Sequence, residues 1–240
     1  MKSCSELRGM SREQLKGNWG TPILVSLVYT IIIVGLQFIP FVGFIAILIL
    51  AAPLTLGLIN YFVSLTRDEN PKFDSLFLGF DNFGKSLGVY FLQALFVFLW
   101  GLFALIPIGI FVFNAFTNPY IFTESLSSFL FIYLCLIIFY IPAMIAQYRY
   151  SMSFYILRDN PEIGIHQSIR ESSEMMKGYK WKFFLLGLSF IGWGLLCVLT
   201  LGIGLLWLMP YMNTTYANFY NELKKSREPE VVSQLEEKEF

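Results

Sequence analysis

The sequence predicts an all-α, polytopic membrane protein with about six transmembrane helices, arranged as three pseudo-repeated hairpins that are each preceded by a cytoplasmic amphipathic helix. The composition supports this class, because 56% of the 240 residues are hydrophobic and 14% are charged, against about 25% charged residues in an average soluble domain. The charged residues and the single His also leave four long gaps, at 17–66, 86–123, 125–148 and 183–221. Basic and acidic residues balance at seventeen each, so no nucleic-acid partner is expected.

The first and last gaps can each hold a helical hairpin. They are 50 and 39 residues long, whereas one helix needs only about 20 apolar residues to cross about 30 Å of hydrocarbon. Pro40 and Gly43 divide the first gap, and Gly202 and Gly204 divide the last, so each hairpin should have a short, uncharged turn. If residues 199–204 were instead continuous helix, the chain would have five spans.

The middle hairpin has a longer connection than the other two. Its apolar runs cover residues 86–113 and 126–157, and the segment between them contains Asn118-Pro119 and Glu124. We interpret residues 107–129 as an insertion on the outer side of the membrane.

A mixed polar and apolar segment precedes each hairpin. Each segment ends in a basic residue, a Gly and an aromatic residue, close to where the following span begins. The aromatic residues are Trp19, Phe83 and Trp181. The three segments are expected to form amphipathic helices at the membrane surface. Each returning helix then contains a proline that marks the repeat, at Pro53, Pro142 and Pro210.

The strings RDENP at 67–71 and RDNP at 158–161 follow the first two returning helices. Because Pro disfavours helical backbone at the preceding residue and can start the next helix, we interpret both strings as repeat boundaries. The units are 5–66, 67–157 and 158–223. Together they form a single integral-membrane domain at 1–223, and a charged cytoplasmic tail at 224–240 is expected to be disordered. The alternative is that the similarities reflect only the shared composition of membrane interfaces.

The basic residues predict the orientation. The two terminal segments and the connections after the second and fourth spans carry sixteen of the seventeen Lys and Arg residues, so both termini should be cytoplasmic. Trp19 and Trp181 are expected in the interfacial belt, with core packing as the alternative. Three lysines near the start of the fifth span are expected to face lipid headgroups, or only to orient the hairpin: Lys177, Lys180 and Lys182.

The remaining basic residue, Arg149, lies inside the fourth span. A charge there costs about 2.5–3.5 kcal/mol on insertion scales, so it should have polar partners. The spacing of polar residues after the repeat prolines predicts a polar cavity formed by Arg149 with Asn60, Gln147 or Asn213. The alternative is that Arg149 extends to the headgroups without a role.

Catalytic and metal-binding patterns are not found in the sequence. Cys4, Cys135 and Cys197 are far apart, and His166 has no second His or Cys nearby. No Gly-rich phosphate loop and no convincing Ser, His and Asp arrangement is present. We therefore expect no enzyme activity, no cofactor and no metal.

Three parts of the sequence carry a resemblance: residues 151–220 (SMSFYILRDNPEIGIHQSIRESSEMMKGYKWKFF and onward), LKGNWG at 15–20 and LFLGFDNFGKSL at 76–87. Together they resemble the bacterial integral-membrane family catalogued as domain of unknown function 975. The resemblance implies a multi-pass protein of the bacterial cytoplasmic membrane and no particular activity. This chain departs from the family pattern by its insertion at 107–129. A function of that loop would therefore not be expected to extend to its relatives.

Two classes of function remain open from the sequence. In the first, the hairpins surround a polar centre, and the protein transports or binds a small or amphiphilic solute that is anionic or lipid-like. In the second, it is a non-catalytic scaffold or accessory subunit of an exporter, sensor or envelope complex, and its polar residues join helices to one another. The expected partners are membrane lipids, with a small solute in the first class and another membrane protein in the second.

Overall fold

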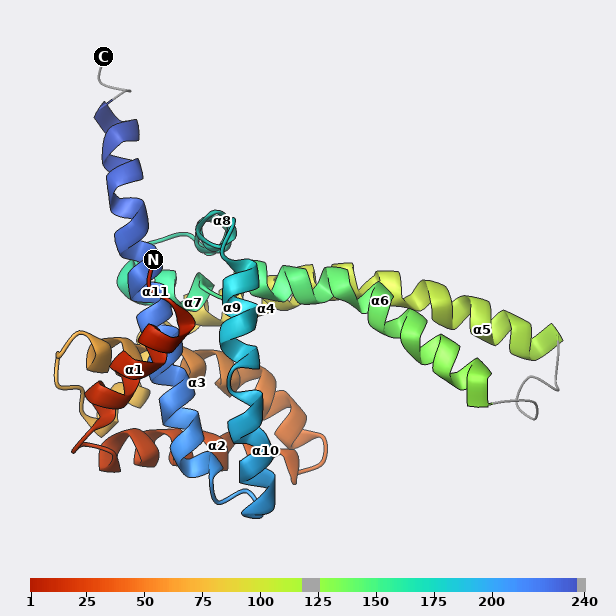
Figure 1. Cartoon of the computed structure of the whole chain (residues 1–240), viewed down its shortest axis with the longest axis horizontal. Helices are drawn as coiled ribbons and strands as arrows, with labels where there is room; N and C mark the ends of the chain where they lie inside the picture. Colours follow the sequence, from red (N-terminus) through yellow and green to blue (C-terminus); the bar gives the residue numbers. More distant parts are fainter. Residues whose placement is uncertain (118–125, 237–240) are drawn as a thin grey trace.

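The computed structural model describes residues 1–117 and 126–236, and the regular structure in these ranges is helical throughout. Figure 1 shows three helical hairpins that come together at one end and diverge at the other. The α-helices are α1 (Cys4–Leu15), α2 (Gly20–Gln37), α3 (Val42–Thr66), α4 (Phe83–Gly101), α5 (Leu105–Thr117), α6 (Leu126–Tyr150), α7 (Ser153–Asp159), α8 (Ile165–Met175), α9 (Lys180–Leu188), α10 (Ile191–Leu199) and α11 (Leu205–Glu236). The 3-10 helices are η1 (Phe73–Leu76), η2 (Leu78–Phe80) and η3 (Leu102–Ala104).

Helix α1 is the amphipathic helix expected before the first hairpin. A capping box starts it, in which the Glu6 backbone N–H donates to Ser3 Oγ at 3.2 Å and the Ser3 N–H donates to the Glu6 carboxylate at 2.6 Å. Its buried face is formed by Leu7, Ser11 and Leu15, one helical turn apart. This face packs against α11, far away in the sequence.

The α2–α3 hairpin turns at residues 38–41, where Pro40 and Gly43 predicted the break. Gly43 is needed because a Cβ there would overlap the carbonyl oxygen of Leu36 in the preceding helix. The α10–α11 turn at 200–204 is also where it was predicted, with Gly202 at a φ of 88° that favours glycine. Because this turn interrupts the helix, the continuous-helix alternative for 199–204 is wrong.

The second expected amphipathic helix is not an α-helix. Residues 73–80 form the two short 3-10 helices η1 and η2, which pack against α3. The backbones come so close that a Cβ at Gly57 of α3 would overlap the Leu76 carbonyl oxygen, and a Cβ at Gly79 would overlap that of Pro53. A longer amphipathic α-helix would place side chains between the two backbones, where there is no room for them.

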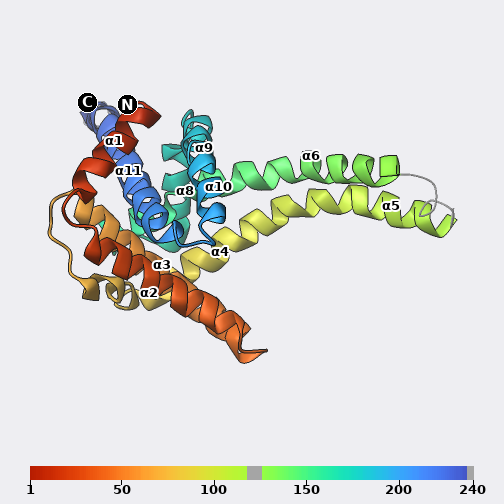
Figure 2. The ribbon, with the colours of Figure 1, turned by 60° about the horizontal axis from the view of Figure 1, so that its bottom comes forward.

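The middle hairpin forms a long arm. Helices α4, η3 and α5 follow one another along one side, and α6 returns beside them; Figures 1 and 2 both show this arm projecting from the other helices. The apolar run expected at 126–157 is divided at Ser151-Met152 into α6 and α7. Of the predicted insertion at 107–129, residues 107–117 belong to α5 and 126–129 to α6, and residues 118–125 lie outside the described ranges.

The third unit begins with α8, the amphipathic helix expected there, which buries Ser168, Ile169, Ser172 and Ser173. Its first span is interrupted at Ser189-Phe190, between α9 and α10. Helix α11 continues to Glu236, so most of the segment from 224, for which we expected disorder, is helical.

Five helical stretches within the described ranges are long and apolar enough to cross a membrane: 20–37, 42–66, 83–110, 133–159 and 180–199. The first half of α11, expected as a sixth span, is not among them because polar residues interrupt it. Thr215 and Asn218 are buried there and are hydrogen-bonded to α1: Thr215 donates to Ser11 Oγ at 3.0 Å, and Asn218 donates to Gln14 Oε1 at 2.7 Å. Helix α1 therefore covers the polar face of α11.

Candidate functional site

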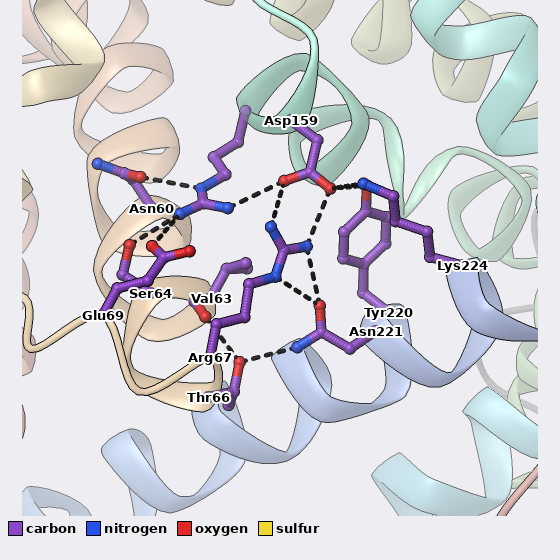
Figure 3. Close-up of polar contacts among 11 residues, drawn as sticks. Asn60, Val63, Ser64, Thr66, Arg67, Glu69, Asp159, Tyr220, Asn221 and Lys224 are labelled. Carbon is purple, nitrogen blue, oxygen red and sulfur yellow. Dashed lines mark hydrogen bonds and ion pairs between the residues drawn. The ribbon is translucent and has the colours of Figure 1, made fainter.

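The two repeated Arg-Asp strings meet in space around Asp159 (Figure 3). Arg67 directly follows α3, Arg158 and Asp159 end α7, and Lys224 lies on α11. We call the following residues the Asp159 cluster: Asn60, Ser64, Thr66, Arg67, Glu69, Arg158, Asp159, Tyr220, Asn221 and Lys224. The cluster joins the ends of α3 and α7 to the middle of α11, and these three helices belong to the three hairpins.

Asp159 is the common acceptor of this cluster, and its side chain is only 4% exposed. Arg67 binds both of its oxygens, with Nη1 to Oδ1 and Nη2 to Oδ2 each at 2.9 Å. Arg158 Nη1 donates to Oδ1 at 2.9 Å, Lys224 Nζ to Oδ2 at 2.6 Å and Tyr220 Oη to Oδ2 at 3.0 Å. A buried carboxylate with this set of charge-assisted bonds is fully compensated.

Further hydrogen bonds hold the two arginines. Arg158 donates to Asn60 Oδ1 at 3.0 Å, Ser64 Oγ at 2.8 Å and Glu69 Oε2 at 2.9 Å. A hydrogen bond from Ser64 lowers the pKa of Glu69; partial burial opposes this shift, and the Arg158 charge adds to it. Arg158 is thus bonded to α3 as well as to Asp159.

Asn221 connects α11 to the end of α3. Its Oδ1 accepts from Arg67 Nε at 3.1 Å and from Arg67 Nη2 at 2.9 Å, and its Nδ2 donates to Thr66 Oγ1 at 2.9 Å. A pocket of about 360 Å³, lined mostly by polar and charged residues, lies beside these residues. Three of its four charged groups have partners, because Arg67 and Lys224 bind Asp159 and Glu222 lies 3.3 Å from Lys2. The cluster is therefore suited to holding helices together more than to binding a ligand.

The two strings have similar residues and different backbones. After α3, Asp68 and Asn70 have φ values of 57° and 49°, in the left-handed region that Asp and Asn tolerate. In the second string, Asp159 is still helical and Asn160 ends the helix. Only the second Asp, Asp159, therefore accepts the hydrogen bonds of both arginines.

The structure does not bring the four predicted cavity residues together. Arg149 Nε donates to Ser173 Oγ of α8, and its guanidinium lies 5.8 Å from the centre of the Tyr150 ring. Asn60 accepts from Arg158, Gln147 is exposed on α6, and Asn213 is half-buried on α11. Among the described residues, no hydrogen bond joins Arg149 to the other three. The serines of α8, packed against α6, supply the partner that the repeat spacing could not indicate.

The residues predicted at the membrane interface differ in exposure. Trp181 is 68% exposed and stacks on Phe184, with ring centroids 5.0 Å apart. Lys177 is exposed, Lys180 is half-buried, and Lys182 Nζ donates to the Met1 carbonyl oxygen at 3.3 Å. Contact of these side chains with lipid headgroups stays a prediction. Trp19 is half-buried at the start of α2 and lines a crevice that the sequence analysis did not predict.

This crevice has a volume of about 360 Å³ and is mainly apolar. We call it the tryptophan crevice, and its lining is Arg12, Trp19, Trp193, Leu196, Cys197, Thr200, Gly204, Trp207, Leu208 and Tyr211. Helix α10 contributes Trp193, Leu196 and Cys197, and α11 contributes Trp207, Leu208 and Tyr211, each set on one helix face. Thr200 and Gly204 come from the turn between the two helices. The spacing within each helix is visible in the sequence, but nothing there shows that the two faces and Trp19 meet.

A metal site is not evident in the described parts of the chain. Over residues 1–117 and 126–236, no three His, Cys, Asp or Glu side chains group closely enough to hold an ion. Those carboxylates that are buried bind cations of the protein itself, as Asp159 does.

The fold and the cluster define the class of this protein as an all-helical chain with several apolar helices of membrane-spanning length. The chain belongs to the family described as Protein of unknown function (DUF975), whose model matches residues 1–227. This agrees with the resemblance seen in the sequence. Comparisons with curated proteins and with solved structures found no match.

Proposed function

We propose that this protein is a non-catalytic membrane protein that binds a lipid-like amphiphile from the bilayer. The observation that carries the proposal is the tryptophan crevice, which lies between α10 and the start of α11 and is mainly apolar. Its volume of about 360 Å³ lies in the range of small-molecule sites. A single acyl chain fits this shape and chemistry better than a polar solute does.

The proposal includes the membrane arrangement. The first half of α11 serves as the sixth span, since its buried polar residues are bonded to its own helix or to α1 and need not meet lipid. Thr214 donates to the Pro210 carbonyl oxygen at 2.7 Å, and Thr215 and Asn218 donate to Ser11. The three hairpins are then internal repeats in the bacterial cytoplasmic membrane, with both termini in the cytoplasm. The Asp159 cluster would lie at the cytoplasmic ends of the spans.

Reporter fusions test this topology. A reporter that is active only in the cytoplasm should be active when fused after Phe240 and inactive when inserted at Glu124. The reason is that the three predicted outer connections contain no Lys or Arg. Activity at both positions, or at neither, would contradict the arrangement.

Mass spectrometry of the protein released from mild detergent tests the proposed function. The wild type should retain about one lipid-like molecule per chain, and a variant with Trp193→Ala and Trp207→Ala should retain much less. Both side chains are about half exposed, at 52% and 49%, so their truncation should leave the fold intact. Trp181→Ala removes an exposed tryptophan away from the crevice and is the matched control. Equal retention in all three proteins would count against the crevice.

The scaffold alternative is favoured by a different feature, the projecting arm of α5 and α6. Large apolar side chains on it are exposed, among them Leu105 at 56%, Phe113 at 69% and Leu134 at 56%. An arm of this kind could pack against the helices of another membrane protein. The same mass spectrometry would then detect a bound protein in place of a lipid.

A further inference from the structure

One arginine of α1 lines the tryptophan crevice, and a second lies one helical turn from it. Arg12 is part of its lining, and Arg8 lies one helical turn earlier on the same face. Arg8 also bonds to the carbonyl oxygen of Ser189, which directly precedes Phe190 and α10, one of the helices that line the crevice. Two guanidinium groups are thus close to an apolar site.

These two arginines have few partners within the described parts of the chain, and Arg8 has a buried nitrogen without one. Within the described ranges, Arg12 makes no side-chain hydrogen bond, and neither arginine forms an ion pair. Arg8 makes one long bond, from Nη1 to the Ser189 carbonyl oxygen at 3.5 Å, and its buried Nε has no partner. A buried donor without an acceptor is costly, and most such groups in proteins are paired.

The arginines of the Asp159 cluster provide the contrast. Arg67 and Arg158 use their guanidinium nitrogens on several acceptors each, including a shared carboxylate. In each of these two arginines, all three guanidinium nitrogens donate to acceptors of the protein. Arg8, with a buried unpaired nitrogen, and Arg12, which is exposed and whose guanidinium no described group of the protein binds, therefore leave donors for an acceptor from outside the chain.

Resting on the proposed function, we infer that the amphiphile in the tryptophan crevice is a phospholipid with a net anionic headgroup, held by Arg8 and Arg12. Lipid chains are as apolar as the crevice, so the chain alone gives little preference over the surrounding bilayer. Guanidinium groups bind phosphate oxygens in a bidentate manner, and that contact supplies the preference. Trp19 also lines the crevice, and its amphipathic ring is suited to the headgroup level.

Fluorescence quenching by brominated lipids can test the headgroup. A variant with Trp100→Phe and Trp181→Phe keeps emission only from the three crevice tryptophans. It is reconstituted in vesicles with one fixed ratio of phosphatidylglycerol to phosphatidylcholine, in which either one lipid or the other is brominated. The surface charge is then the same in both samples. The complementary variant, which keeps only Trp100 and Trp181, gives the quenching caused by lipids that merely surround the protein.

The expected result is a preference for phosphatidylglycerol at the crevice tryptophans above that of the complementary variant. Replacing Arg12 by Gln should reduce this preference about fivefold, as should replacing Arg8 by Gln. Lys16→Gln removes a charge at the exposed end of the same helix and should change nothing. Arg12 is exposed, so its replacement should not affect folding even if Arg8→Gln does.

Three outcomes would overturn the inference in distinguishable ways. Strong quenching of the crevice tryptophans that is equal for both lipids would leave the proposed function intact and exclude the anionic preference. Quenching no stronger than in the complementary variant would exclude the lipid site altogether. If inorganic phosphate abolished the preference for phosphatidylglycerol, the arginines would bind a free anion and not a lipid headgroup.

Discussion

Replacing Asp159 by Asn should lower the free energy of unfolding by about 3–5 kcal/mol, the cost of removing one partner from a buried ion pair. The substitution keeps the shape of the side chain and removes the charge that binds Arg67, Arg158 and Lys224. The three cations would then repel one another without a shared carboxylate. The change can be measured by unfolding the purified protein in mixed detergent micelles with increasing SDS.

A suitable control is Glu162→Gln. The Glu162 side chain is 99% exposed and lies 3.5 Å from Lys85, and exposed pairs of this kind contribute about 0–1 kcal/mol. The double variant with Asp159→Asn and Arg67→Gln should lose less stability than the sum of the two single variants, because the groups share one network. An Asp159→Asn protein within about 1 kcal/mol of the wild type would show that the cluster does not hold the hairpins together.

Much of the helical framework could be predicted from local chemistry. The turns at Pro40-Gly43 and Gly202-Gly204 were found because Pro and Gly act on the backbone where they occur. The long apolar runs predicted the five helical stretches that are long and apolar enough to cross a bilayer, since length and composition decide this property. These signals need no knowledge of which helix lies beside which.

The sequence could not predict which helices pack against one another. The two Arg-Asp strings were interpreted as boundaries, yet their side chains are joined at Asp159, and Asn221 and Lys224 of a third helix complete the cluster. Arg149 was assigned to Asn60, Gln147 or Asn213 from repeat spacing, whereas it binds Ser173 of α8. Spacing within one helix gives the face of a residue, and only the packing of helices gives its partner.

The amphipathic segment before the middle hairpin shows how a single close contact can override a pattern. Residues 73–85 have a mixed polar and apolar composition, which predicted a helix at the membrane surface. In the fold, Gly79 lies against the Pro53 carbonyl and Gly57 lies against the Leu76 carbonyl. Two backbones in direct contact leave no room for the side chains of a regular α-helix, and η1 and η2 form instead.

Replacing Gly57 by Ala should therefore destabilise the protein by about 3 kcal/mol or more, at or beyond the upper end of ordinary overpacking. The new methyl group would overlap the Leu76 carbonyl oxygen, a backbone atom that cannot rotate away as a side chain can. Gly35→Ala on α2 is the matched control, since nothing lies within 4 Å of the added methyl group. That change should be neutral or stabilise the helix by up to about 1 kcal/mol. Similar unfolding curves for the two variants would mean that α3 and the 3-10 segment are not in backbone contact in the membrane.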